Sequence, residues 1–114
     1  MSLPIRHGEG KLYVAESHLL ARIEEEHLAP CRYMDPATEK PTQKFPHNPN
    51  GSIHAIAGLC DPTGRIFGLM PHPEAFLFPE NHPRWDLLRL HDELPVQGDG
   101  LKIFSNAVQY IMNA

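Results

Sequence analysis

The chain has 114 residues, which suits one small domain, and residues 1–114 are therefore predicted to form a single domain. Its 41% hydrophobic and 21% charged residues are ordinary for a globular protein, and a net charge of −4 offers no basic surface to a nucleic acid. No apolar run approaches the roughly 20 residues that cross a bilayer, and the start of the chain has no apolar segment of the kind found in signal peptides.

Cysteine, histidine and proline usage narrows the setting further. Two cysteines, Cys31 and Cys60, do not make a disulfide framework, so a reducing cytoplasm is the expected location. The eight histidines are scattered and never take the spacing of a zinc site, so no metal site is expected. Twelve prolines are about twice the average frequency and predict short extended pieces and rigid turns in the middle of the chain.

The first predicted elements are an extended arm and a helix. Residues 4–14, "PIRHGEGKLYV", gain β-branched and aromatic side chains toward their end, which predicts a strand or hairpin arm carrying His7 and Glu9. Ser17 is predicted to cap a helix over residues 18–29. Apolar side chains recur there at helical spacing, at Leu20, Ile23 and Leu28.

A short strand, a loop and a hairpin are predicted next. Residues 30–35 are a short strand candidate, and the polar, proline-rich residues 36–52 predict a loop. Two apolar segments, 53–61 and 65–71, flank the turn sequence "DPTG" and predict a β-hairpin. Because both arms are almost continuously apolar, the hairpin is predicted to be substantially buried.

Two helices are predicted near the end of the chain. Residues 84–94 form a short helix candidate with Leu87, Leu90 and Leu94 on one side. Asp99 is predicted to cap a second helix over residues 100–112. That helix carries one apolar stripe, made of Leu101, Phe104, Ala107, Val108 and Ile111.

The segment "GLMPHPEA", residues 68–75, runs from an apolar strand into His72 and Glu74, each of which follows a proline. Pro73 keeps His72 out of the helical region, and residues two apart on an extended chain point to the same side. The imidazole and the carboxylate are therefore predicted to form a hydrogen bond. Such a carboxylate fixes the imidazole tautomer and stabilises the imidazolium, as in nucleophilic catalysis. The alternative is a rigid surface turn that merely carries two polar residues.

Four segments together resemble one family. They are "HGEG" (7–10), "NPNGS" (48–52), "IAGLCDPTGRIFGLMPHPE" (56–74) and "GDGLKIFSNAV" (98–108). In these segments the chain is similar to the C-terminal half of the glutaminase component of phosphoribosylformylglycinamidine synthase, a class I glutamine amidotransferase of purine biosynthesis. The resemblance implies an α/β fold: the C-terminal half of a flavodoxin-like layered domain, with a largely parallel sheet between helices.

The resemblance also implies roles for individual residues. The histidine and glutamate of P-H-P-E complete a Cys-His-Glu triad in that family, which would make His72 the general base and Glu74 the residue that orients it. The family usually has arginine after this glutamate, where this chain has Ala75. His7, Gly8 and Glu9 match a motif expected near the glutamine pocket, so they are candidates to line it; the alternative is a structural role in the strand.

The nucleophile that His72 would activate is not found in the sequence. The family's cysteine lies in a G-x-C-x-G-x-Q elbow between a strand and a helix, and no such motif occurs here. Cys31 lies in a strand candidate and Cys60 precedes a hairpin turn, so neither is expected to be the nucleophile. The chain alone is therefore predicted to be inactive toward glutamine.

Three explanations of the missing half remain open at this point. The chain is one product of a split gene, a cloned fragment of a longer protein, or a remnant that acts as a non-catalytic interaction or structural protein. Under the first two, its partners would be the N-terminal half of the domain or a second copy of the chain, together with a synthetase subunit. Glutamine would be the substrate. The resemblance implies no cofactor in this chain, and ATP and Mg²⁺ used by the synthetase.

Overall fold

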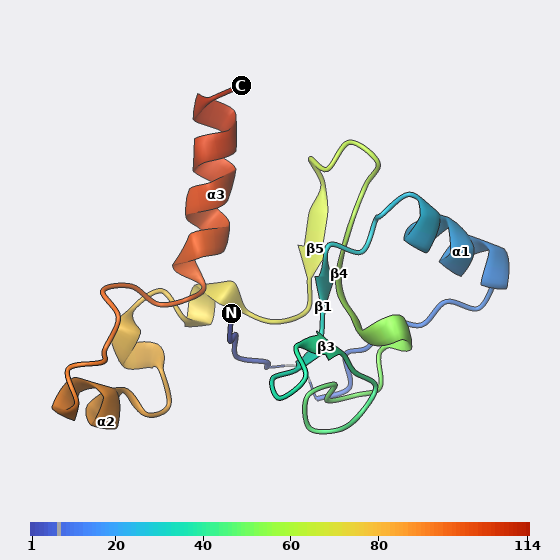
Figure 1. The fold of residues 1–114 in the computed structure, drawn as a ribbon. Coiled ribbons are helices and arrows are strands. Elements are labelled where there is room, and N and C mark those ends of the chain that lie inside the picture. Colours follow the sequence, from blue (N-terminus) through green and yellow to red (C-terminus); the bar gives the residue numbers. More distant parts are fainter. Residues whose placement is uncertain (7) are drawn as a thin grey trace. The chain divides into compact units, whose positions relative to one another are not determined.

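A computed structural model of the chain describes residues 1–6 and 8–114. The chain forms two compact units (Figure 1). The sheet unit spans His7–Met70, and the helical unit combines Met1–Arg6 with Pro71–Ala114. The predicted mixture of helices and strands is confirmed, whereas the single domain stays a prediction.

A three-stranded sheet lies at the centre of the sheet unit. Its strands are β1 (Cys31–Arg32), β4 (Ile56–Cys60) and β5 (Phe67–Leu69), in the order β1-β4-β5. Both pairs are antiparallel, and Gly58 of β4 is opposite Cys31 on one side and Leu69 on the other. The predicted hairpin is confirmed. A largely parallel sheet is not found among the strands that the structure describes.

The predicted strand at residues 30–35 is divided in two. Tyr33 separates β1 from β2 (Met34–Asp35), and β2 pairs antiparallel with β3 (Lys40–Pro41) in a second small sheet. The short β3 falls within the segment that was predicted to be a loop throughout. Polar, proline-rich composition did not predict it, because the strand depends on pairing with β2 rather than on its own side chains.

Burial differs sharply between the two arms of the hairpin. Ile56 and Ala57 at the start of β4 are 0% and 4% exposed, and Ala57 packs with Tyr33 in a small core. In the other arm, Ile66 is 73% exposed and Phe67 42% exposed. The prediction that both arms are buried is therefore wrong for the second arm, which pairs with β4 alone among the described strands.

The turn of the hairpin is organised by one carboxylate. Asp61 Oδ1 accepts hydrogen bonds from the backbone N–H groups of Arg65 and Ile66, at 3.0 and 2.9 Å. Its Oδ2 accepts from the hydroxyl of Thr63 at 2.6 Å. Gly64 takes a φ of 69°, which is costly for any residue with a Cβ. These contacts explain why "DPTG" turns the chain here.

The first helix, α1 (Ser17–Glu25), confirms a prediction but ends earlier than expected. Ser17 is its first residue rather than its cap, because Glu16 occupies the capping position. The chain leaves the helix at His27, whose φ of 55° is incompatible with continuing it.

Two predicted extended segments are wrong. Residues 53–55 form the 3-10 turn η1 (Ile53–Ala55) instead of a strand, with positive φ at His54 and Ala55. The described residues between 4 and 14 contain no strand. Leu12 is held there by two hydrogen bonds instead of strand pairing. Its N–H donates to Ser52 Oγ at 3.0 Å, and its carbonyl accepts from the Ile53 N–H at 3.1 Å.

The helical unit contains two short 3-10 turns and two helices. In chain order they are η2 (Pro73–Ala75), η3 (Pro79–Asn81), α2 (Trp85–Leu90) and α3 (Leu101–Met112). Both helices were predicted, although α2 is shorter than residues 84–94. Asp99 does not cap α3: Gly100 is the capping residue, and the Asp99 carboxylate instead accepts a hydrogen bond from the Ser2 N–H at 2.8 Å.

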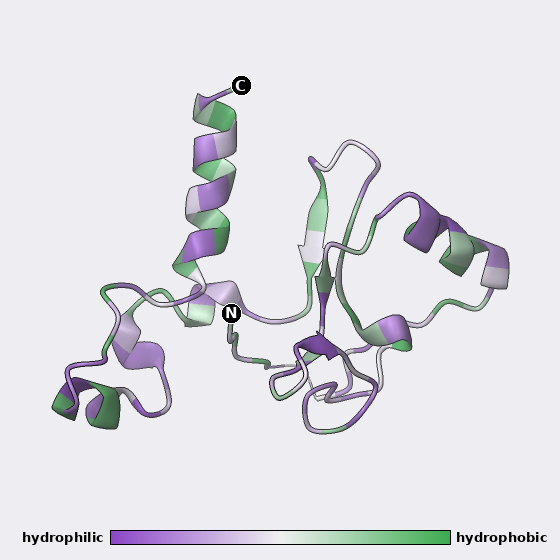
Figure 2. Cartoon of the chain, in the orientation of Figure 1, coloured by the Kyte–Doolittle hydropathy of each residue, from purple (hydrophilic) through white to green (hydrophobic). Residues whose placement is uncertain are grey.

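The apolar stripe of α3 is exposed rather than packed. Phe104, Val108 and Ile111 are 43%, 55% and 72% exposed, and the hydropathy colours alternate around this helix (Figure 2). The stripe therefore has no packing partner along most of its length within the described residues. No helix among the residues the structure describes is long and apolar enough to span a membrane.

Candidate functional site

His72 and Glu74 form the hydrogen-bonded pair that the sequence predicts. His72 Nδ1 and Glu74 Oε1 are 2.6 Å apart. The local backbone differs from the predicted extended chain, because Pro73 opens the 3-10 turn η2 and Glu74 lies inside it. His72 itself stays outside the helical region, at φ −108° and ψ 86°, as expected for a residue before proline. The two side chains thus meet across a tight turn.

The ionised carboxylate of Glu74 determines which nitrogen of a neutral His72 imidazole carries the proton. The pKa of Glu74 is lowered below its usual 4.5, and the hydrogen bond from His72 is the largest cause. A hydrogen bond from the backbone N–H of Glu74 is the next cause. Desolvation raises the pKa, and the charges of His72 and Arg6 lower it further. An ionised carboxylate can only accept, so the proton of a neutral imidazole lies on Nδ1. Nε2 is then the nitrogen with a free lone pair.

The pair is accessible from solvent. The His72 side chain is 36% exposed and the Glu74 side chain 56% exposed. The backbone beneath them is tied down: the His72 N–H donates to the Pro4 carbonyl at 2.8 Å, and the Ala75 N–H donates to the His72 carbonyl at 3.1 Å. A base on an anchored turn with an open side can receive a proton from a group that approaches it from outside the turn.

Of the candidate pocket residues, Gly8 and Glu9 belong to the sheet unit. His7 lies outside the described residues, so its prediction is not examined by the structure. Gly8 and Glu9 are exposed and precede Gly10, whose carbonyl accepts a hydrogen bond from Asn50 Nδ2 at 2.9 Å. Their role in lining a glutamine pocket stays a prediction.

The "NPNGS" segment forms a buried hydrogen-bonded cluster inside the sheet unit. Asn48 and Ser52 are each only 1% exposed. Asn48 Oδ1 accepts from the Ser52 N–H at 3.0 Å, while its Nδ2 donates to the carbonyls of Thr42 and Ser52 at 3.2 and 3.0 Å. The Ser52 hydroxyl donates to the Ile56 carbonyl and accepts from the Leu12 N–H. The sequence singled out this motif but gave it no role. Asparagine and serine inside a loop are typical of such a hydrogen-bonded cluster, because their side chains bond to nearby backbone groups.

The two cysteines have no catalytic surroundings within the described residues. Cys31 lies in β1 and Cys60 ends β4, so each is followed by strand or turn rather than by a helix. Burial, and to a lesser extent the neighbouring Cys60, raises the pKa of the Cys31 thiol. A raised pKa disfavours the thiolate that a nucleophile requires.

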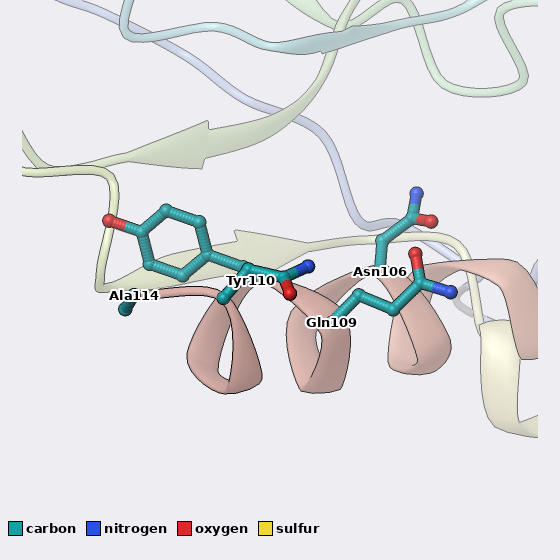
Figure 3. A pocket seen from close by; sticks show the side chains of 5 residues that line it. Asn106, Gln109, Tyr110 and Ala114 are labelled. Carbon is teal, nitrogen blue, oxygen red and sulfur yellow. The ribbon is translucent and has the colours of Figure 1, made fainter.

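A shallow hollow on the side of α3 offers a different kind of surface (Figure 3). It is lined by Asn106, Gln109, Tyr110, Asn113 and Ala114. These side chains supply amides and a phenol, but no nucleophile and no base for neutral pH. Among the described residues, no group of three or more His, Cys, Asp or Glu side chains could hold a metal ion.

Comparison with known proteins gives this geometry a context. The family of CobB/CobQ-like glutamine amidotransferase domains matches residues 1–111, nearly the whole chain. The chain belongs to this family.

Relatives of this chain include subunits of one particular enzyme. The chain is 43% identical over 108 residues to the phosphoribosylformylglycinamidine synthase subunit PurQ of Dehalococcoides mccartyi, a match that covers 95% of this chain and 38% of that subunit. It is 39% identical over 111 residues to the PurQ subunit of Methanothrix thermoacetophila, covering 97% and 40%. The phosphoribosylformylglycinamidine synthase of Drosophila melanogaster is 44% identical over 70 residues, or 61% of this chain and 5% of that enzyme.

These matches confirm the resemblance stated from the sequence motifs. They also show that the chain spans about two fifths of the length of the two PurQ subunits. The catalytic roles of His72 and Glu74 are not tested by the matches and stay predictions.

Proposed function

We propose that the chain supplies the proton-handling half of a glutaminase site in a phosphoribosylformylglycinamidine synthase. The observation that carries the proposal is the 2.6 Å contact between His72 Nδ1 and Glu74 Oε1. It leaves Nε2 of a neutral imidazole as the base, held on an anchored turn and open on one side. The similarity to PurQ subunits indicates the reaction that such a base would serve.

The reaction would need a cysteine from a polypeptide segment outside these 114 residues. His72 Nε2 would accept the thiol proton, and the ionised Glu74 would stabilise the imidazolium through Nδ1–H. The thiolate would attack the carboxamide carbon of glutamine. The collapsing intermediate would take a proton from His72 and release ammonia, leaving a thioester. Water, deprotonated by His72, would hydrolyse that thioester and release glutamate.

The completing segment would also finish the fold. We infer that this chain is the C-terminal half of a flavodoxin-like amidotransferase domain, in which further strands and helices cover what is exposed here. Two features support this: the uncovered stripe of α3, and a sheet of only three short strands in the described residues. Apolar surface of this kind is a frequent mark of an interface. The ammonia would pass to a synthetase subunit, where ATP and Mg²⁺ act; this chain would bind no cofactor.

The decisive experiment is reconstitution. The chain alone, given glutamine, is expected to release no glutamate, because nothing in it can form the thioester. Mixed with a polypeptide that carries the cysteine elbow of a PurQ subunit, it is expected to release glutamate. Replacing His72 with Ala should abolish that activity, whereas replacing the exposed His91 with Ala should leave it unchanged. Turnover by the chain alone would contradict the missing-nucleophile argument.

A non-catalytic interaction protein is the second candidate, and the exposed stripe of α3 favours it equally. In that case the chain would bind its partner without glutamate release, and His72→Ala would change neither binding nor activity. The same reconstitution therefore separates the two functions.

A further inference from the structure

Two glycines lie directly against the turn that carries Glu74. The Gly100 N–H donates a hydrogen bond to the Phe76 carbonyl at 2.9 Å, and the Gly98 N–H donates to the Leu77 carbonyl at 3.1 Å. Both bonds join the backbone just before α3 to Phe76 and Leu77, the two residues that follow η2. The two glycines of the loop "GDG", residues 98–100, therefore contact the segment around η2 through their backbone atoms.

Neither glycine leaves space for a side chain. A Cβ on Gly100 would collide with the carbonyl oxygen of Pro73 and lie 2.7 Å from its carbonyl carbon. A Cβ on Gly98 would collide with the carbonyl oxygen of Phe76 and lie 2.8 Å from the carbonyl carbon of Leu77. In both cases the obstacle is backbone, which cannot move away as the end of a flexible side chain can.

The usual reason for a glycine does not apply at Gly100. Its φ of −65° and ψ of −28° are helical angles, in which alanine is normally the better residue. What requires glycine here is the close approach of the Pro73 carbonyl, not the dihedral angles. Pro73 lies between His72 and Glu74 in the chain, so a displaced Pro73 carbonyl moves the backbone that joins the two side chains.

We propose that Gly98 and Gly100 are positioning residues: they form a seat that holds the η2 turn at the geometry in which Glu74 accepts from His72 Nδ1. The first residues of the chain hold the same turn from another side. The His72 N–H donates to the Pro4 carbonyl, and the Ser2 N–H donates to Asp99 Oδ2 between the two glycines. The turn is thereby bonded to the chain's first residues on one side and to the "GDG" loop on the other. The importance of this seat for catalysis rests on the proposed function; its effect on the imidazole does not.

The test reads the tautomer of His72 by ¹⁵N NMR of the full 114-residue chain, near neutral pH. In the unmodified chain the neutral imidazole should be the Nδ1–H tautomer. Gly100→Ala should shift it toward the Nε2–H tautomer that predominates for a free imidazole in water. The matched control is Gly68→Ala, because a Cβ at Gly68 meets nothing within 4 Å. The control should keep the Nδ1–H tautomer, and an unchanged tautomer in Gly100→Ala would overturn the proposal.

A second measurement covers the case in which Gly100→Ala does not fold. In the unmodified chain, the amide protons of Gly98 and Gly100 should exchange with solvent more slowly than that of Gly64, whose N–H donates within the exposed hairpin turn. Exchange of both at the rate of an unfolded peptide would refute the seat. Both readouts are independent of glutamine turnover, so a failed seat and a failed glutaminase function are distinguished.

Discussion

Glu74 accepts the hydrogen bond from His72 Nδ1, and its proposed role requires the charge of a carboxylate as well as an acceptor oxygen. Replacing Glu74 with Gln keeps the size of the side chain but removes the charge that would stabilise an imidazolium. In the reconstituted complex, Glu74→Gln should lower kcat by a large factor with a smaller effect on KM, because the charge matters when His72 holds the proton. The exposed Glu93 provides the control: Glu93→Gln should change neither constant. A Glu74→Gln variant with full kcat would remove this carboxylate from the mechanism.

The lowered pKa of Glu74 has a consequence for acid stability. Because its folded value lies below the usual 4.5, the ionised group contributes stability that is fully present above pH 4.5 and is lost as the pH falls through the lower folded value. A ¹³C NMR titration of the Glu74 carboxyl group should therefore show a midpoint below 4.5. In His72→Ala the midpoint should rise, since the hydrogen bond from His72 is the largest cause of the shift.

The carboxyl group of Asp61, in the hairpin turn, also has a lowered pKa. Hydrogen bonds, the first of them from the Thr63 hydroxyl and the next from the Ile66 backbone, lower its pKa from 3.8 to about 2. Its contribution to the hairpin should be complete above pH 3.8 and lost as the pH falls through about 2. The Ile66 amide proton should be protected from exchange at pH 4 and lose protection near pH 2. Thr63→Val should raise the Asp61 pKa, while Thr38→Val, in an exposed turn, should not.

At the scale of elements, the buried side chain of Asn48 holds the loop of the sheet unit together through three hydrogen bonds. Asn48→Ala would leave the Ser52 N–H and the carbonyls of Thr42 and Ser52 without their bonds to this side chain. A buried group left unsatisfied costs about 1–3 kcal/mol, and we expect a loss in that range in the free energy of unfolding in urea. Asn113→Ala, at an exposed position, should change it by no more than about 0.5 kcal/mol. If both substitutions changed the free energy of unfolding equally, at one chain concentration, the structural role of this hydrogen-bonded cluster would be contradicted.

Elements that depend on local signals were predictable, and elements that depend on distant partners were not. Helix α3 follows from its apolar periodicity, and the β4–β5 hairpin follows from "DPTG" between apolar segments. The cap of α3 was missed because Asp99 bonds to Ser2, almost the whole chain length away. Strand β3 was missed for a different reason: it pairs with the nearby β2, but its own side chains carry no strand pattern.

The candidate site shows the same division. The contact of His72 with Glu74 could be predicted because two prolines restrict a four-residue segment. The route was nevertheless different, since the segment is a 3-10 turn and not an extended chain. The seat made by Gly98 and Gly100 could not be predicted. It arises from the approach of the "GDG" loop to a turn more than twenty positions earlier, which no local pattern encodes.

At the scale of the whole molecule, the exposed stripe of α3 should control association. We expect the chain in dilute solution to sediment as a dimer or larger species unless a partner is present, because burying this stripe removes apolar surface from water. Ile111→Glu should shift the population toward monomer. Gln109→Glu adds the same charge at another exposed position of the helix and should not. A well-folded monomer of the unmodified chain would contradict this expectation.

The bond from the His72 N–H to the Pro4 carbonyl affects how the protein can be handled. Met1 is three residues from Pro4 and so lies at most about 11 Å from it. An affinity tag or fluorescent protein fused ahead of Met1 would therefore begin within about 11 Å of the residue that holds the His72 backbone. The same fusion after Ala114 would follow the last turn of α3 instead. Preparations meant for binding or activity measurements should carry their tags at the carboxyl end.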